Sequence, residues 1–129
     1  MSFEDYASEC AVCEIDGEIK KTLCPVCLTQ KVVRGKWKIV IIWLLRDKEL
    51  RFSQIRKSIP NITQAYLSSQ LKNLESDKLL IRKSYNEIPP RVEYSLSEEG
   101  RNFVSVINHV NDWGFEYLSK RMAETASKK

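Results

Sequence analysis

The chain has 129 residues, of which 43% are hydrophobic and 29% are charged, and its formal net charge is +4. This length allows one ordinary domain with a single core and is too short for two. The composition is typical of soluble globular proteins, and no apolar run approaches the roughly 18 residues of a membrane span. The acidic N-terminus has no basic-then-apolar signal segment, so we expect a cytoplasmic protein with no membrane partner.

The charges are distributed unevenly along the chain. Residues 1–19 carry six acidic side chains and no basic one, so the rest of the chain has a net charge of +10. Residues 31–91 alone hold 14 basic side chains against five acidic ones. A compact basic region favours a polyanionic partner, most often the phosphate backbone of nucleic acid. The alternative is that these lysines and arginines only keep the surface soluble.

All four cysteines lie within residues 10–27, in two Cys-x-x-Cys pairs separated by ten residues. The Asp-Gly sequence inside residues 15–19 predicts a tight hairpin between the pairs. Two thiolates from each pair can complete a tetrahedral site, which favours one structural Zn²⁺ per chain. The predicted metal ligands are Cys10, Cys13, Cys24 and Cys27.

A thiol–disulfide switch is the second hypothesis for these cysteines. Cys24 is expected near the start of a helix, whose dipole lowers the pKa of a thiol, and Cys27 follows one turn later as a resolving partner. Oxidation of zinc thiolates would eject the metal, so the two hypotheses can merge. An iron–sulfur cluster and unrelated, inert cysteines are the remaining alternatives.

The next segments predict three helices. A short helix is expected over residues 22–33 and ends before Gly35. Residues 36–45 are apolar on nearly all sides, as in a helix packed in the middle of a domain. Residues 50–59 predict a shorter helix with Ser53 as its N-cap, and a Pro-Asn break follows.

A helix over residues 63–77, capped by Thr63, buries a leucine stripe at positions 67, 71 and 74. At 100° per residue, the opposite face consists of short, mostly uncharged side chains. A solvated helix face normally carries more charge, so we interpret this face as one that approaches the floor of a DNA groove, where Gln64 can pair with an adenine edge. The outward residues are Ala65, Ser69, Lys72 and Ser76, flanked by Gln64, Ser68 and Asn73.

The pattern then changes to period two over residues 80–85 and 91–96, which predicts a two-stranded ribbon. The proline-rich residues 86–90 form its stiff tip. Ser97 begins a long final helix with an aromatic-rich apolar stripe, and a dimer interface is the simplest way to cover that stripe. The stripe consists of Phe103, Val106, Val110, Trp113 and Tyr117.

This order of elements predicts a mainly α fold with a small β-wing (α+β), namely a winged helix-turn-helix with a long C-terminal dimerisation helix. We expect three segments: the acidic, cysteine-bearing residues 1–27, the DNA-binding domain 28–100, and the dimerisation helix and tail 101–129. The helix over residues 63–77 would enter the major groove, and basic residues around it would contact the DNA. These are Arg51, Arg56 and Lys57 before it and Arg82, Lys83 and Arg91 on the wing.

Four blocks resemble HxlR-type transcriptional regulators, which are relatives of the MarR group. They are "CPV" (24–26), "GKWKIVIIWLL" (35–45), "RFSQIRKSIPNITQAYLSSQLKNLESDKLL" (51–80) and "PPRVEYSLSEEG" (89–100), and the resemblance extends over residues 24–113. It implies a homodimeric DNA-binding protein of the bacterial or archaeal cytoplasm, joined through its N-terminal and C-terminal helices. For such a dimer we expect a palindromic double-stranded operator. Several members of this family sense oxidants through one cysteine, at the position of Cys24, and the three additional cysteines depart from that pattern.

We expect no enzymatic activity. The sequence has no phosphate-binding glycine loop, no His-Glu-x-x-His and no nucleophile elbow, and its one histidine, His109, is expected on the final helix. The predicted function is therefore that of a sequence-specific DNA-binding regulator of HxlR type, modulated through its N-terminal cysteines. The alternative is a winged-helix protein–protein adaptor with a structural zinc site and no DNA binding, because a fold alone does not fix a function.

Overall fold

The computed structural model describes residues 25–127, apart from the side chains of Cys27 and Ser127. The chain divides into two compact units, residues 1–38 and 39–129, which are described separately. The expected cysteine hairpin and the side chains of all four cysteines lie outside the described residues. In the first unit, α3 spans Pro25–Val32, within the predicted helix. Gly35 follows with a φ of 129°, which only glycine adopts readily, so the predicted break is confirmed.

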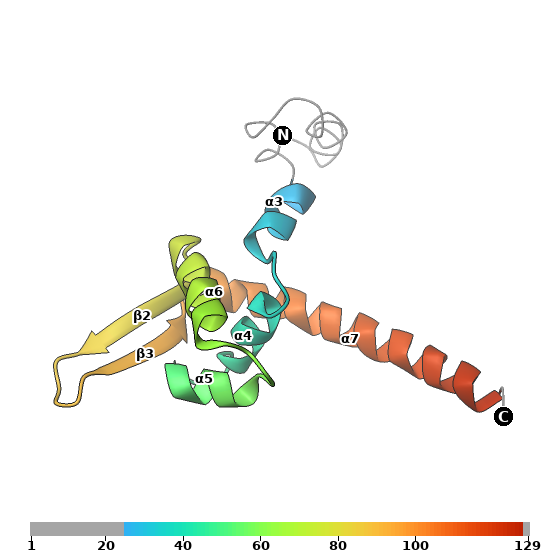
Figure 1. Ribbon diagram of the computed structural model, residues 1–129. Helices are drawn as coiled ribbons and strands as arrows, with labels where there is room; N and C mark the ends of the chain where they lie inside the picture. Colours follow the sequence, from blue (N-terminus) through green and yellow to red (C-terminus); the bar gives the residue numbers. More distant parts are fainter. Residues whose placement is uncertain (1–24, 128–129) are drawn as a thin grey trace. The chain divides into compact units, whose positions relative to one another are not determined.

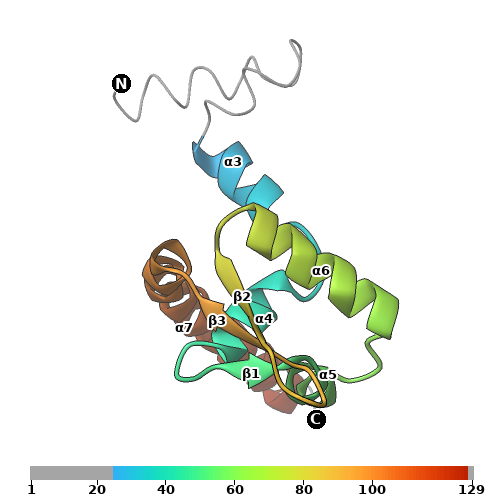
Figure 2. The same ribbon diagram turned by 90° about the vertical axis from the view of Figure 1, so that its left-hand side faces the viewer.

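The second unit contains most of α4 (Lys38–Leu44), then α5 (Phe52–Ser58), α6 (Gln64–Ser76) and the long α7 (Glu98–Ser127), as Figures 1 and 2 show. These helices and a small sheet enclose one aliphatic core. Burial of such side chains is the main stabilising contribution to a domain of this kind. The core residues are Ile41, Ile42, Leu45, Leu50, Ile55, Ile59, Ile62, Leu67, Leu71, Leu74, Leu79, Leu80, Leu96 and Ile107.

The sheet has three antiparallel strands, β1 (Leu50–Arg51), β2 (Leu80–Tyr85) and β3 (Arg91–Leu96), in the order β1-β3-β2. The predicted ribbon is confirmed at both of its strands. Directly opposed residues share a face of a sheet, so the register assigns each side chain to a side. Arg82 pairs with Tyr94 on one face, while Lys83 pairs with Glu93 on the other. We call β2, β3 and their connecting residues 86–90 the wing.

The start of the predicted helix over residues 50–59 is wrong. Leu50 and Arg51 are extended and pair with Tyr94 and Glu93 of β3, so they form β1. The N-cap of α5 is Arg51 rather than Ser53, and its backbone N–H donates to Oε1 of Gln54 at 2.8 Å. Pairing with β3, a strand far along the chain, overrides the local helical pattern, and this pairing leaves no local sequence signal.

The beginning of α6 confirms the prediction. Asn61, at the Pro-Asn break, has a φ of 61°, and Oγ1 of Thr63 accepts a hydrogen bond from the N–H of Tyr66 at 3.1 Å. This bond satisfies one of the free donors at the helix start. The leucine stripe is buried as predicted, and Gln70, which the pattern did not include, is buried beside it.

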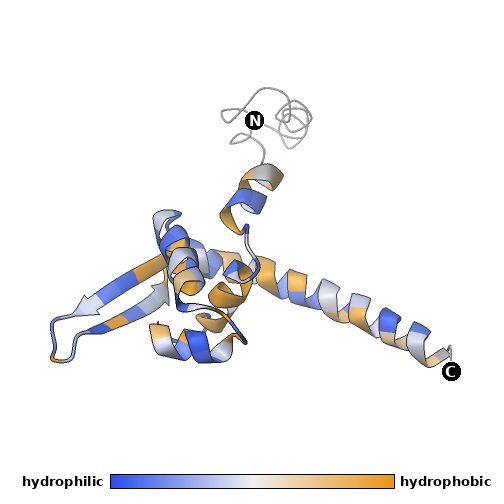
Figure 3. Ribbon diagram, in the orientation of Figure 1, coloured by the Kyte–Doolittle hydropathy of each residue, from blue (hydrophilic) through white to orange (hydrophobic). Residues whose placement is uncertain are grey.

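The capping residue of α7 joins this helix to the end of α6. Oγ of Ser97 accepts from the N–H of Gly100 at 3.1 Å and donates to the carbonyl of Lys78 at 2.6 Å. From this junction α7 extends well beyond the other elements of its unit, and apolar residues recur along its length (Figures 1 and 3). No helix within residues 25–127 combines the length and the apolar character needed to cross a membrane.

Candidate nucleic-acid interface

The outward face of α6 is exposed as predicted. Six of its residues form what we call the reading face, and Ser76 extends this face at the C-terminal end. The face carries one cation, no acid and mostly small side chains, so the helix backbone can come close to a groove floor. The reading face consists of Gln64, Ala65, Ser68, Ser69, Lys72 and Asn73, all exposed.

The first turns of α6 contain two features that the sequence pattern did not reveal. Tyr66 is 38% exposed, so an aromatic ring borders the reading face at the end of the helix that enters a groove in helix-turn-helix proteins. The hydroxyl of Ser69 donates to the carbonyl of Tyr66 at 2.7 Å, which leaves its oxygen free to accept. The sequence did contain one signal of this aromatic contact surface, namely a tyrosine in the first turn of the helix, close to the predicted reading residues.

A cavity of about 320 Å³ lies between α6 and the wing. Lys72 of α6 and Arg82 of β2 both line it, together with Ser68, Glu75 and Tyr94. Arg82 donates to the hydroxyl of Ser84 at 3.3 Å, and neither cation forms an ion pair with any acid of the described chain. Two cations without carboxylate partners thus meet at the place where the reading helix adjoins the wing.

The predicted cations before α6 also lie at the surface. Arg51 is exposed on β1, and Arg56 and Lys57 are exposed in the last turn of α5. Exposed cations beside a reading helix can contact phosphates and so fix the position of a protein on DNA without reading its sequence.

The wing cations do not share one surface. Arg82 lies on the face that lines the cavity, whereas Lys83 and Arg91 lie on the opposite face. Arg91 is also the most buried of the predicted cations, and it forms ion pairs with Glu87 and Glu93. The sequence contained no signal of these ion pairs.

On this second face, the pKa of Glu49 is raised, chiefly by hydrogen bonding with the carboxyl group of Glu93, whose charge adds to the effect. The same bond lowers the pKa of Glu93, to which Arg91, the hydroxyl of Tyr85 and Arg51 also contribute. Glu49 is therefore the member of the pair that takes up a proton first.

The structure gives no placement for the predicted cysteine site. Within residues 25–127, no three His, Cys, Asp or Glu residues are grouped in a way that could hold a metal ion. His109 is exposed on α7. The metal and redox hypotheses for Cys10, Cys13, Cys24 and Cys27 therefore stay predictions that rest on their spacing.

The chain is similar to known regulators over most of its length. Residues 32–122 match the HxlR-like helix-turn-helix family. An HTH-type transcriptional regulator of Bacillus subtilis (strain 168), YdeP, is 44% identical over 97 residues, which cover 75% of this chain and 76% of that protein. The crystal structure of the HTH-type transcriptional regulator ytcD has a TM-score of 0.71 at 40% identity and covers 74% of this chain and 97% of the other. The oxidised form of the redox regulator HypR has a TM-score of 0.68 at 40% identity, and the match covers 72% of this chain and 96% of that one.

Proposed function

We propose that this chain, which belongs to the HxlR-like helix-turn-helix family of DNA-binding transcriptional regulators, binds a palindromic operator as a homodimer and acts in the cytoplasm. In this proposal α6 reads base edges in the major groove of each half-site. Side chains on the reading face then discriminate between base pairs, each good contact contributing about 1–3 kcal/mol.

The observation that carries the proposal is the pair of free cations in the cavity between α6 and the wing. When one helix lies in the major groove and a ribbon follows the neighbouring minor groove, the strand that separates the grooves passes between them. Lys72 and Arg82 line this gap without carboxylate partners in the described structure. They are thus available to bind a phosphate of that strand, and Arg51, Arg56, Lys57 and Lys83 would add phosphate contacts.

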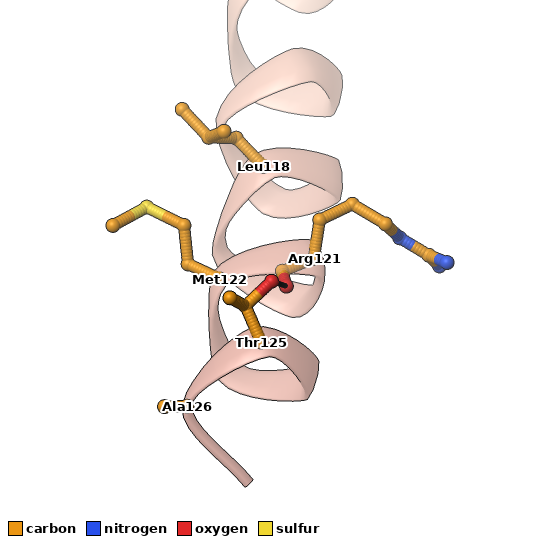
Figure 4. A pocket seen from close by; sticks show the side chains of 5 residues that line it. All are labelled: Leu118, Arg121, Met122, Thr125 and Ala126. Atoms are coloured by element: carbon orange, nitrogen blue, oxygen red, sulfur yellow. Dashed lines mark hydrogen bonds between the residues drawn. The ribbon is translucent and has the colours of Figure 1, made fainter. Parts of the chain in front are cut away.

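The homodimer is supported by the apolar surface that α7 leaves exposed. Trp113 and Phe115 are 67% and 73% exposed, and the rings of Trp113 and Tyr117 stack on each other at 5.1 Å. Further along, Leu118, Met122 and Ala126 project to one side of the helix and Arg121 to another (Figure 4). An apolar stripe of this length on a helix that extends away from its own core is typical of a subunit interface. We propose that α7 of a second protomer, together with the N-terminal helix, covers it.

The N-terminal cysteines are the proposed site of regulation. They precede residue 32, where the family match begins, so the proposal rests on their spacing and on the likeness to HypR, which is described as a redox regulator. Four thiolates in two Cys-x-x-Cys pairs suit one Zn²⁺, and oxidation of Cys24 and Cys27 would release it.

Elemental analysis should give about one zinc per chain, and diamide should change DNA affinity in the wild type but not in Cys24→Ser. If the purified protein contains no metal and diamide does not change its DNA affinity, both the zinc site and the thiol switch are contradicted.

The test of DNA binding is a salt titration on a duplex obtained by in vitro selection. Binding that neutralises phosphates weakens log-linearly with salt, and each lost phosphate contact reduces the slope by about 0.9. We expect Lys72→Gln to reduce the slope by about this amount relative to the wild type, with Lys120→Gln on α7 as the matched control. A wild-type protein that selects no duplex sequence, and whose association with DNA is insensitive to salt, would instead support the adaptor function.

A further inference from the structure

Four side chains form a compact cluster on the wing face opposite the cavity. Tyr85 and Arg91 are the last opposed residues before the tip, and Lys83 and Glu93 are the next opposed pair on the same face, two residues further from the tip. Because the side-chain direction alternates along a strand, all four lie on the same face of the ribbon. Glu87, the first charged residue of the tip, reaches the same cluster.

Arg91 is the centre of this cluster. Its Nη2 lies 3.4 Å from Oε1 of Glu87, and its Nε lies 3.5 Å from Oε1 of Glu93. The guanidinium carbon lies 4.0 Å from the centroid of the Tyr85 ring. The hydroxyl of Tyr85 donates to the second oxygen of Glu93 at 3.3 Å, so the network is closed. One planar group thus contacts β2, β3 and the tip together, which a guanidinium can do and an ammonium cannot.

The tip beyond this cluster has no cation. Residues 86–90 are Asn-Glu-Ile-Pro-Pro, and the side chain of Ile88 is fully exposed. Glu87 is the only charged residue among them, and Arg91 neutralises it. Arg91 would have to leave two carboxylates and the Tyr85 ring before it could bind a phosphate, whereas Arg82 has no ion pair to break within the described residues.

We infer that Arg91 is a positioning residue that fixes the direction of the wing tip, and that the phosphate contact next to α6 is made by Arg82. The inference rests on the proposed DNA binding, and it assigns different roles to two arginines that look equivalent in the sequence. Removal of Arg91 would leave the number of phosphate contacts unchanged while the tip loses its fixed orientation. Binding then has to order the tip, which lowers affinity without changing the salt dependence.

Salt titrations of matched variants separate the two roles. In Arg82→Gln the slope of log affinity against log salt should fall by about 0.9, because a phosphate contact is lost. In Arg91→Gln the slope should equal that of the wild type, while affinity falls about 3- to 10-fold at every salt concentration. Charge-preserving variants give a second comparison. Arg82→Lys keeps a cation at the phosphate and should restore the slope that Arg82→Gln loses, whereas Arg91→Lys should not restore the affinity that Arg91→Gln loses, because an ammonium cannot both stack on Tyr85 and bridge the two carboxylates.

A DNA-free measurement tests the same inference independently of the proposed function. Backbone ¹⁵N order parameters of Glu87 and Ile88 should be near about 0.85 in the wild type and in Arg82→Lys, and should fall below about 0.6 in Arg91→Lys. Thermal unfolding of each variant verifies that the rest of the unit remains folded. If the wild type fails to bind any duplex, the proposed function fails, and the order parameters still decide whether Arg91 holds the tip. A slope that falls by about 0.9 in Arg91→Gln, or a rigid tip in Arg91→Lys, overturns the inference.

Discussion

Gly100 occupies a position where the structure has no room for a side chain. It lies in the first turn of α7, and a Cβ built there would overlap the carbonyl oxygen of Leu79 and lie 3.3 Å from Cβ of Leu96. That carbonyl accepts the N–H of Ser97 at 3.0 Å, so it belongs to the junction that starts α7. The obstacle is backbone, which cannot rotate away as a flexible side chain would. In Gly100→Ala the junction itself must therefore shift.

The cost can be estimated from these contacts. Overpacking by one methyl group typically costs about 1–3 kcal/mol, and weakening of the hydrogen bond from Ser97 adds about 1 kcal/mol. The higher helix propensity of alanine offsets about 1 kcal/mol of this. We therefore expect Gly100→Ala to lower the free energy of unfolding by about 1–3 kcal/mol, which for a chain of this size lowers Tm by about 4–11 °C.

Gly114 provides the matched control in the same helix. Among the described residues, and apart from the adjacent backbone of α7, a Cβ there meets no atom within 4 Å, so Gly114→Ala adds helix propensity without a clash in the protomer and should raise stability by up to about 1 kcal/mol. Both variants are compared with the wild type by thermal and urea unfolding at one protein concentration, because Tm of a dimer depends on concentration. If Gly100→Ala unfolds at or above the wild-type Tm, the close contact with Leu79 does not exist in solution.

Three further predictions concern the other surfaces. Glu49→Gln should raise Tm at pH 7, because the amide removes the repulsion from Glu93. The pKa of Glu49 is raised in the folded state, so ionisation of this one group costs stability as pH rises above the ordinary value of 4.5, and the advantage of the variant should vanish below that pH in a Tm series. Met122→Asp should give a helical monomer in sedimentation experiments, since it places a charge in the proposed α7 interface, whereas Lys120→Gln should remain a dimer. Removal of the proposed zinc by a strong chelator should change the N-terminal segment while unit 39–129 keeps its ellipticity; loss of the whole fold would show that a bound metal has a wider role.

The parts of the fold that could be predicted are those encoded by local patterns. The ribbon was found at its correct residues because period-two alternation and the proline tip are local signals, and α6 was found because Thr63 and the leucine stripe mark its start and its buried face. The exposure of the reading face followed from the same stripe.

The parts that were missed depend on residues far apart in the chain. β1 exists because Leu50 and Arg51 pair with β3, and no property of residues 50–59 alone distinguishes this from a helix. The separation of Arg82 from Arg91 required the register of the ribbon, and the neutralisation of Arg91 required the positions of Glu87 and Glu93. Charge counting identifies cations, but only geometry shows which of them are free to bind a phosphate.

A comparison of two serine variants tests most directly whether α6 reads DNA. Ser69 lies in the reading face and Ser105 on α7, and the two are alike: both are exposed, and each hydroxyl donates to the carbonyl three residues earlier, at 2.7 and 2.9 Å. On a selected duplex at a single salt concentration, Ser69→Glu should weaken binding by about 100-fold or more, because a carboxylate would face the base edges and phosphates. Ser105→Glu, with the same change of charge, should bind within about 3-fold of the wild type. Equal binding by the two folded variants would contradict the assignment of α6 as the DNA-reading helix.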